Sequence, residues 1–211
     1  MATADGKPNI SAQQVKELRD RTGVGFAACR EALVEATGDI ERAIDLLRKK
    51  GQATAAKKAQ RATSEGLVSC YIHAGGKIGV LIEVNCETDF CAKSEAFQAL
   101  VKELALQVAA LNPRVVRREE LSPEVIEQER QIYASQAEGK PAAVVTKIVD
   151  GKIEKFYKEA CLLEQAYARD PNKTVNDLLV EAALQMREKI DVRRFTRYQL
   201  GEALDAKAGP A

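Results

Sequence analysis

The first fifty residues carry apolar side chains at steps of three and four, the spacing of one face of a helix. Ser11 to Gln14 forms a capping box that predicts a helix start, and glycines divide the pattern that follows. Gly38 is expected to end the second helix and Gly51 the third. Three helices this short can bury their apolar faces only against one another, so the pattern predicts a compact three-helix domain. The repeating apolar positions are Val15, Leu18, Phe26, Cys29, Leu33, Ala36, Ile40, Ala43, Ile44 and Leu47.

The chain then changes to a two-residue alternation, which is the period of a β-strand. Runs at 67–73 and 77–86 flank Gly75-Gly76 and predict a hairpin. A helical pattern over 94–111 follows and is expected to cover the apolar face of that hairpin. The face includes two cysteines, interpreted as small core residues. Its positions are Val68, Cys70, Ile72, Ile78, Val80, Ile82, Val84 and Cys86.

The remainder of the chain predicts three more helices and one more strand. Two helices are expected between Pro123 and Leu163, with Gly151 interrupting the second, and Thr174 caps a third. Residues 192–200 alternate and are expected to return to the hairpin as a third strand. The predicted fold class is therefore α+β, with an antiparallel sheet of about three strands packed with helices.

These patterns divide the chain into five expected parts. They are a flexible leader (1–10), the three-helix domain (11–51), a basic helical linker (52–65), an α+β core domain (66–200) and a flexible tail (201–211). The linker is rich in Ala, Lys and Arg but has no large apolar residue, so its composition favours helix without a buried face. Its basic side chains are interpreted as a solvated face rather than an anion site. They are Lys49, Lys50, Lys57, Lys58 and Arg61.

Charge and cysteine content argue against several classes of function. The 32 Lys and Arg residues nearly cancel the 31 Asp and Glu residues, so the overall charge indicates neither a nucleic-acid nor a membrane partner. Five scattered cysteines and one histidine, without a Cys-x-x-Cys pair, predict reduced thiols, no metal site and no cofactor. There is neither a signal peptide nor an apolar run of the ~20 residues that a membrane span requires, so a cytoplasmic location is expected.

One polar connector carries an unusual pair of side chains. The stretch from Asn85 to Lys93, here called the probe loop, joins a predicted strand to a predicted helix and holds Asp89 next to Phe90. A large apolar residue in a connector is usually buried, so the ring could fold back onto its own sheet. The alternative is that Asp89 and Phe90 project from a rigid base toward a partner. The pattern leaves both interpretations open.

Nothing in the chain predicts an enzyme. No nucleotide-cradling glycine loop, metal cluster, pair of catalytic carboxylates or nucleophile with a base is recognisable. Cys91 near Asp89, with His73 at a distance, is the grouping most like an active site, but it lacks an orienting spacing. His73 is interpreted as a surface residue.

Several stretches, taken together and in order, resemble translation elongation factor Ts of the bacterial type, over about residues 10–201. The Asn-Cys-Glu-Thr-Asp-Phe run in its strand-to-helix context is the most specific of them. The matching stretches are Val15-Lys16-Glu17-Leu18-Arg19, Arg21-Thr22-Gly23-Val24-Gly25, Gly38-Asp39-Ile40, Ala56-Lys57-Lys58-Ala59, Glu83-Val84-Asn85-Cys86-Glu87-Thr88-Asp89-Phe90, Leu162-Leu163-Glu164-Gln165 and Val192-Arg193-Arg194-Phe195.

The resemblance implies a guanine-nucleotide exchange factor that binds elongation factor Tu·GDP, dislodges magnesium and promotes GDP release. It implies a ubiquitin-associated-like module at 11–51, a dimerisation-type core, and a possible homodimer or 2:2 complex without direct nucleic-acid contact. The magnesium-dislodging loop would comprise Thr88, Asp89, Phe90 and Cys91. The GTPase-docking residues would be Gly23, Val24, Gly25, Phe26 and Lys58, with Phe26 standing where many members have methionine.

Two other functions stay open at this point. A helix-binding adaptor using the three-helix module would need no probe loop. A ribosome- or RNA-binding protein using the basic linker would show a strong salt dependence of RNA affinity.

Overall fold

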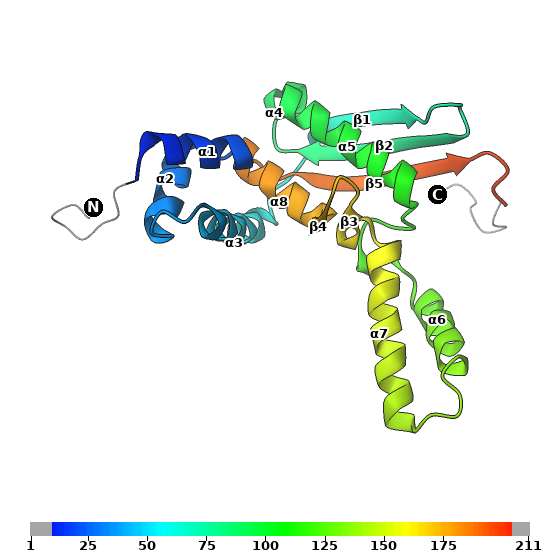
Figure 1. Ribbon diagram of the computed structural model, residues 1–211. Coiled ribbons are helices and arrows are strands. Elements are labelled where there is room, and N and C mark those ends of the chain that lie inside the picture. The colour runs from blue at the N-terminus through cyan, green and yellow to red at the C-terminus, as the bar shows by residue number, and fades with distance from the viewer. Residues whose placement is uncertain (1–9, 204–211) are drawn as a thin grey trace. The chain divides into compact units, whose positions relative to one another are not determined.

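The computed structural model describes residues 10–203, which form a mixed fold of helices and a small sheet and confirm the predicted α+β class (Figure 1). The predicted leader up to residue 9 and the predicted tail from residue 204 lie outside the described residues. The chain forms two compact units, each drawn from separate stretches. The first comprises the residues up to 66 with 85–97 and 176–191, and the second comprises 67–84, 98–175 and the residues from 192 onward.

Three helices at the start of the first unit pack around a small apolar core, as the sequence predicts. They are α1 (Ala12–Thr22), α2 (Phe26–Glu35) and α3 (Ile40–Lys58). The predicted capping box starts α1: the Ser11 hydroxyl accepts from Gln14 N at 3.2 Å, and Gln14 Oε1 accepts from Ser11 N at 2.9 Å. The buried core comprises Val15, Leu18, Val24, Cys29, Ala32, Leu33, Ala36, Ala43 and Leu47.

The third helix runs on to Lys58, so its predicted end at Gly51 is wrong. The Ala- and Lys-rich residues that follow favour helix. Gly51 itself is buried against α8 (Val175–Met186), and a Cβ placed there would lie 3.1 Å from Val180 Cγ1 and 3.6 Å from Leu184 Cδ2. The glycine is therefore a site of close helix approach, and Leu184 also packs against the core of the three-helix module.

A three-stranded sheet lies almost wholly in the second unit, in the order β1-β2-β5, so the predicted return of residues 192–200 to the hairpin is confirmed. The strands are β1 (Glu65–Ile72), β2 (Ile78–Cys86) and β5 (Asp191–Gln199). Helix α5 (Glu95–Leu111) lies along one face of the sheet (Figure 1). The buried side chains of β2 and α5 include Val80, Ile82, Val84, Val101, Leu104 and Val108.

The face predicted for β1 is wrong. Val68 and Ile72 are exposed, and Cys70 is an exposed free thiol rather than a core residue. A Cβ added to Gly79 would lie 3.2 Å from Ile72 Cδ1, so Ile72 shares a face with the odd-numbered β2 positions, including the exposed Leu81. The even-numbered β2 positions are the ones buried under α5. Alternation shows which residues share a face, but the strand register decides which face is covered.

Two helices of the second unit form a helical hairpin (Figure 1). They are α6 (Pro123–Ser135) and α7 (Ala142–Ala160), with short 3₁₀ turns at η1 (Arg118–Glu120) and η2 (Leu162–Glu164). Helix α7 is continuous through Gly151, so the predicted interruption is wrong. One glycine costs a helix only about 1 kcal/mol, which the other eighteen residues outweigh. Arg118 ties η1 to α7 by an ion pair to Glu154, at 2.8 Å, and to η2 by an ion pair to Glu164.

A small β-ribbon follows η2 and was not predicted from the sequence. Strand β3 (Ala166–Tyr167) pairs antiparallel with β4 (Asp170–Thr174). The buried amide of Gln107 organises it, donating to Ala166 O at 3.0 Å and accepting from Ala168 N at 2.9 Å. Nearby, the Tyr167 hydroxyl donates to Glu103 at 2.9 Å. Burial, aided by Glu103, raises the pKa of Tyr167 to about 12.

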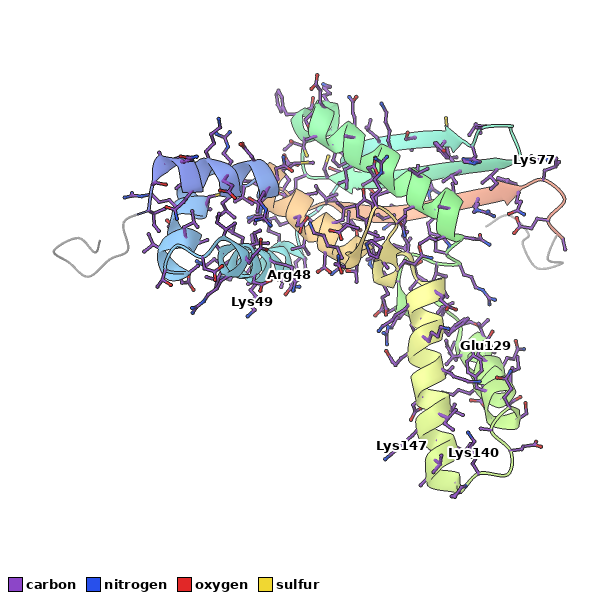
Figure 2. The ribbon with its side chains drawn as sticks, in the orientation of Figure 1. Arg48, Lys49, Lys77, Glu129, Lys140 and Lys147 are labelled. Atoms are coloured by element: carbon purple, nitrogen blue, oxygen red, sulfur yellow. The ribbon has the colours of Figure 1, made fainter. Side chains whose placement is uncertain are left out.

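Charged side chains cover much of the helical surface. Figure 2 shows Arg48 and Lys49 projecting away from α3, and Lys147 projecting from α7. None of the helices formed by residues 10–203 has the length and apolar character that crossing a membrane requires.

Candidate functional site

The probe loop contains a short helix rather than an irregular turn. Helix α4 spans Asp89–Lys93, and the Thr88 hydroxyl caps it by accepting from Cys91 N at 3.2 Å. Ser94 leaves the helical conformation before α5 begins, and its hydroxyl donates to Cys91 O at 2.7 Å. The first turn of α4, which carries Phe90, therefore has a backbone that is fixed at both ends.

The ring of Phe90 is 82% exposed, so it does not fold back onto the sheet. The structure thus decides between the two interpretations in favour of a projecting ring. Beside it, the Asp89 carboxylate lies 2.7 Å from Lys93 Nζ, one turn further along α4. This hydrogen bond lowers the pKa of Asp89, so the carboxylate is ionised at neutral pH. Cys91 has the opposite environment: it is buried, and burial raises its pKa to about 12.

Glu188, in the turn between α8 and β5, holds the base of the probe loop. Its Oε2 accepts from the backbone N–H groups of Glu87 and Thr88, both at 3.0 Å. Its Oε1 accepts from the Thr88 hydroxyl at 2.5 Å. One carboxylate thereby satisfies two main-chain donors and orients the capping residue of α4. Sequence reasoning missed Glu188, because it lies about one hundred residues from its partners and belongs to no periodic pattern.

A second group of contacts joins the same turn to the end of α3. Glu87 accepts from Lys189 N at 2.6 Å and pairs with Arg61 at 3.0 Å, and the Lys189 bond is the main reason its pKa is lowered. Lys189 Nζ donates to the Arg61 carbonyl at 3.0 Å, and Lys58 Nζ donates to Arg187 O at 2.5 Å. Lys58 and Arg61 thus support the base of the probe loop, whereas the sequence pattern suggested a solvated basic face.

The expected docking residues form the junction between α1 and α2. Gly23 ends α1 with φ +67°, a left-handed conformation that glycine adopts without steric cost. Gly25 caps α2, Val24 between them is buried in the module's core, and Phe26 is 49% exposed. The two glycines and the buried valine therefore fix the turn, and Phe26 is the side chain among these four that offers a large apolar contact surface.

The enzyme-like grouping suggested by the sequence does not have the environment that nucleophilic catalysis requires. An activated cysteine needs a lowered pKa, whereas that of Cys91 is raised. His73 is exposed and shares a hydrogen bond of 3.0 Å with the Tyr71 hydroxyl.

Comparisons with known proteins agree with the resemblance seen in the sequence. The sequence model of the family described as Elongation factor TS matches residues 11–202. The chain is 58% identical over 198 residues to Elongation factor Ts of Caldanaerobacter subterraneus subsp. tengcongensis, and the aligned residues cover 93% of this chain and 99% of the relative. It is 56% identical to Elongation factor Ts of Desulforamulus reducens (94% and 92% covered) and 55% identical to that of Geotalea daltonii (94% and 93% covered). With the family model and these relatives spanning nearly its whole length, the chain belongs to the elongation factor Ts family of translation elongation factors.

Proposed function

We propose that this chain is a guanine-nucleotide exchange factor that binds elongation factor Tu·GDP, dislodges its magnesium ion and promotes GDP release during translation elongation. The observation that carries the proposal is the exposed Phe90 ring beside an ionised Asp89, on a backbone held by Glu188. The role needs no covalent chemistry and no cofactor, because exchange follows from the factor's tighter binding to the nucleotide-free GTPase.

The free energies show which residues the proposal requires. Bound GDP is held partly by magnesium, which bridges phosphate oxygens and protein groups. Shifting the GTPase decisively to its empty state takes about 5.5 kcal/mol of differential affinity. Burying one phenyl ring supplies only ~1.5–3 kcal/mol. Phe90 therefore acts together with a polar or repulsive contribution from Asp89, whose charge Lys93 partly offsets, and with docking contacts elsewhere.

We assign the docking contacts to the Gly23–Phe26 turn and to Lys58. Phe26 supplies an exposed ring on a turn whose left-handed conformation Gly23 permits and which the buried Val24 anchors to the module. Lys58 contributes through its hydrogen bond to Arg187 O, which joins the linker to the turn that bears Glu188. Docking at the module supplies affinity for both GTPase states, and the probe loop supplies the preference for the empty one.

Replacing the ring tests the proposal directly. Phe90→Ala should slow release of a fluorescent GDP analogue from elongation factor Tu in a stopped-flow experiment. The melting temperature should hardly change, because substitutions at exposed positions usually shift stability by less than about 0.5 kcal/mol. Ile132→Ala, at an exposed apolar position on α6, is the matched control and should release GDP at the unmodified rate. A release rate that Phe90→Ala leaves unchanged would remove the ring from the mechanism.

A second variant separates docking from exchange. Phe26→Ala should weaken binding to elongation factor Tu in a titration while the release rate at saturating factor stays near that of the parent chain. If Phe26→Ala and the parent chain bound elongation factor Tu with equal affinity, the Gly23–Phe26 turn would not be part of the interface.

We also propose that the uncovered face of the sheet binds a second copy of this chain. Val68 and Leu81 are exposed there and line a shallow hollow with Glu83, Arg194 and Phe195. The hollow presents an apolar floor beside Glu83 and Arg194, which neutralise each other in an ion pair of 2.7 Å, so a second copy related by a two-fold axis would bury apolar surface there without leaving an unpaired charge. Sedimentation of the chain should show a dimer that Leu81→Lys converts to monomer. Sedimentation of the parent chain as a monomer at all concentrations would refute the pairing.

The alternative RNA-binding function has less support. Lys50 pairs with Glu35 at 2.6 Å, and Lys58 and Arg61 are occupied at the base of the probe loop. RNA affinity that falls steeply with salt would favour this alternative over exchange.

A further inference from the structure

Two buried thiols and a carboxylate meet beneath the probe loop. Cys86 ends β2, Cys91 lies in α4 and Glu188 lies in the turn after α8. One ligand atom of each, two sulfurs and a carboxylate oxygen, lie within 4.8 Å of one another. Both thiols are free. A fourth group is close, because Cys91 Sγ lies 3.7 Å from the thioether Sδ of Met186.

We propose that Cys86, Cys91 and Glu188 form a binding site for a thiolate-preferring divalent cation of the Zn²⁺ type, with Met186 beside the fourth position. Zinc in proteins is tetrahedral, with sulfur ligands at about 2.3 Å, which places its ligand atoms roughly 3.8 Å apart. The Cys91–Met186 separation already has this value, and the ligand atoms of Cys86, Cys91 and Glu188 need to approach one another by about 1 Å or less. Thiolate and thioether ligands favour soft cations over magnesium or calcium.

The surroundings of Glu188 supply the outer support that metal ligands usually have. Its Oε1 accepts from the Thr88 hydroxyl and its Oε2 from two backbone N–H groups, so the carboxylate is oriented before a cation arrives. Cys86 Sγ donates its proton to Thr88 O at 3.2 Å, so this thiol also has a fixed direction. Each thiol loses its proton to solvent as a metal–sulfur bond forms, and no redox change takes place.

This site departs from the sequence-based expectation that the chain holds no metal. The two cysteines are separated by four residues, which is the upper end of the usual spacing of zinc-binding pairs but not a Cys-x-x-Cys pair, and Glu188 comes from the far end of the chain. The inference is also independent of the exchange activity, since it concerns binding of a cation by the chain alone.

The test is a titration of the full, reduced chain with Zn²⁺ by calorimetry, repeated with Co²⁺ to detect thiolate-to-metal charge-transfer absorption. One cation per chain should bind with release of protons. Cys91→Ser and Cys86→Ser should each weaken binding about tenfold or more and reduce the charge-transfer band. Glu188→Gln should weaken binding but keep the band. Cys70→Ser is the matched control, since Cys70 is an exposed thiol outside the cluster, and it should leave both readouts unchanged.

Three outcomes would overturn the proposal: no binding by the parent chain, a Co²⁺ complex without a thiolate band, or equal affinities for the parent chain and Cys91→Ser. Because serine at a buried position can disturb folding, Cys91→Val provides a second variant that keeps an apolar side chain. Its circular dichroism should match that of the parent chain while cation binding is lost. A folded Cys91→Val that binds as tightly as the parent would also overturn the site.

Discussion

Removing the Glu188 carboxylate should loosen the probe loop without unfolding the chain. In Glu188→Ala the backbone N–H groups of Glu87 and Thr88 and the Thr88 hydroxyl all lose their acceptor. A hydrogen bond contributes about 1 kcal/mol net to stability, so three of them favour the closed loop by about 3 kcal/mol. Since each 1.4 kcal/mol is tenfold in an equilibrium constant, the open population should rise about a hundredfold.

Hydrogen exchange of individual amides measures this opening. Protection of the Glu87 and Thr88 amides should fall about a hundredfold in Glu188→Ala, while amides in the centre of α5 keep theirs, because a connector opens locally before the whole chain unfolds. The exchange is measured in the presence of a chelator, so that a bound cation does not contribute to the protection of these amides. Glu188→Gln keeps an acceptor oxygen but loses the charge, so its protection should be intermediate. Glu17→Ala, which removes an exposed carboxylate from α1, is the matched control.

The same variant connects the loop to the proposed activity. If only the closed loop binds productively, the apparent affinity for elongation factor Tu falls in proportion to the closed population. For an open population of about 1% in the parent chain, a hundredfold rise leaves roughly half of the loops closed, and GDP release at subsaturating factor should then slow about twofold in Glu188→Ala even though Phe90 and Asp89 are present. Unchanged protection of the Glu87 and Thr88 amides would refute the reasoning about the hydrogen bonds, whatever the release rate.

Three further changes probe other parts of the fold. Gly51→Val should lower stability by about 1–3 kcal/mol in a denaturant titration, because its side chain overpacks against Val180, 3.1 Å from the Cβ position; a more stable variant would contradict this. Gln107→Met should cost about 1–3 kcal/mol in the same titration, because the buried Gln165 Oε1 loses its amide donor at 3.2 Å, and a neutral result would show that water replaces the amide. Tyr167→Phe should remove the ionisation near pH 12 from a spectrophotometric titration of the tyrosines. Because folding raises this pKa, the neutral phenol stabilises the fold below the unfolded pKa of about 10, and that stability is lost as the pH rises toward 12; Tyr167→Phe should be less sensitive to alkali over this range.

Local patterns predicted the elements whose apolar faces point into a core. The spacing of Val15 and Leu18 gave α1, and the alternation of Val80, Ile82 and Val84 gave the covered face of β2. The same rule failed on β1, where Val68 alternates as clearly but lies on the open face. A periodic pattern carries no information about pairing register, so the sequence alone does not distinguish a face under a helix from one left uncovered.

Only some residues of the candidate site could likewise be identified from the sequence. Asp89 and Phe90 were identified because a large ring in a polar connector is unusual. Glu188 escaped notice, since nothing near it in sequence indicates that its partners lie about one hundred residues away. Gly51 was interpreted as a helix end because glycine commonly ends helices, whereas here it leaves room for Val180. The failures at Glu188 and Gly51 both concern contacts between distant segments.

The contact between Gly51 and α8 has a consequence for how the protein is made. The three-helix module emerges from the ribosome early, but Val180 and Leu184, which pack against Gly51, are synthesised more than a hundred residues later. From Lys58 to Met186 the chain grows by 186 − 58 = 128 residues, which takes about 6–26 s at ~5–20 residues per second. During that interval the part of α3 around Gly51 is uncovered on the nascent chain, although Ala43 and Leu47 can already pack in the core of the module. A chaperone that shields apolar helix surfaces would act in this period.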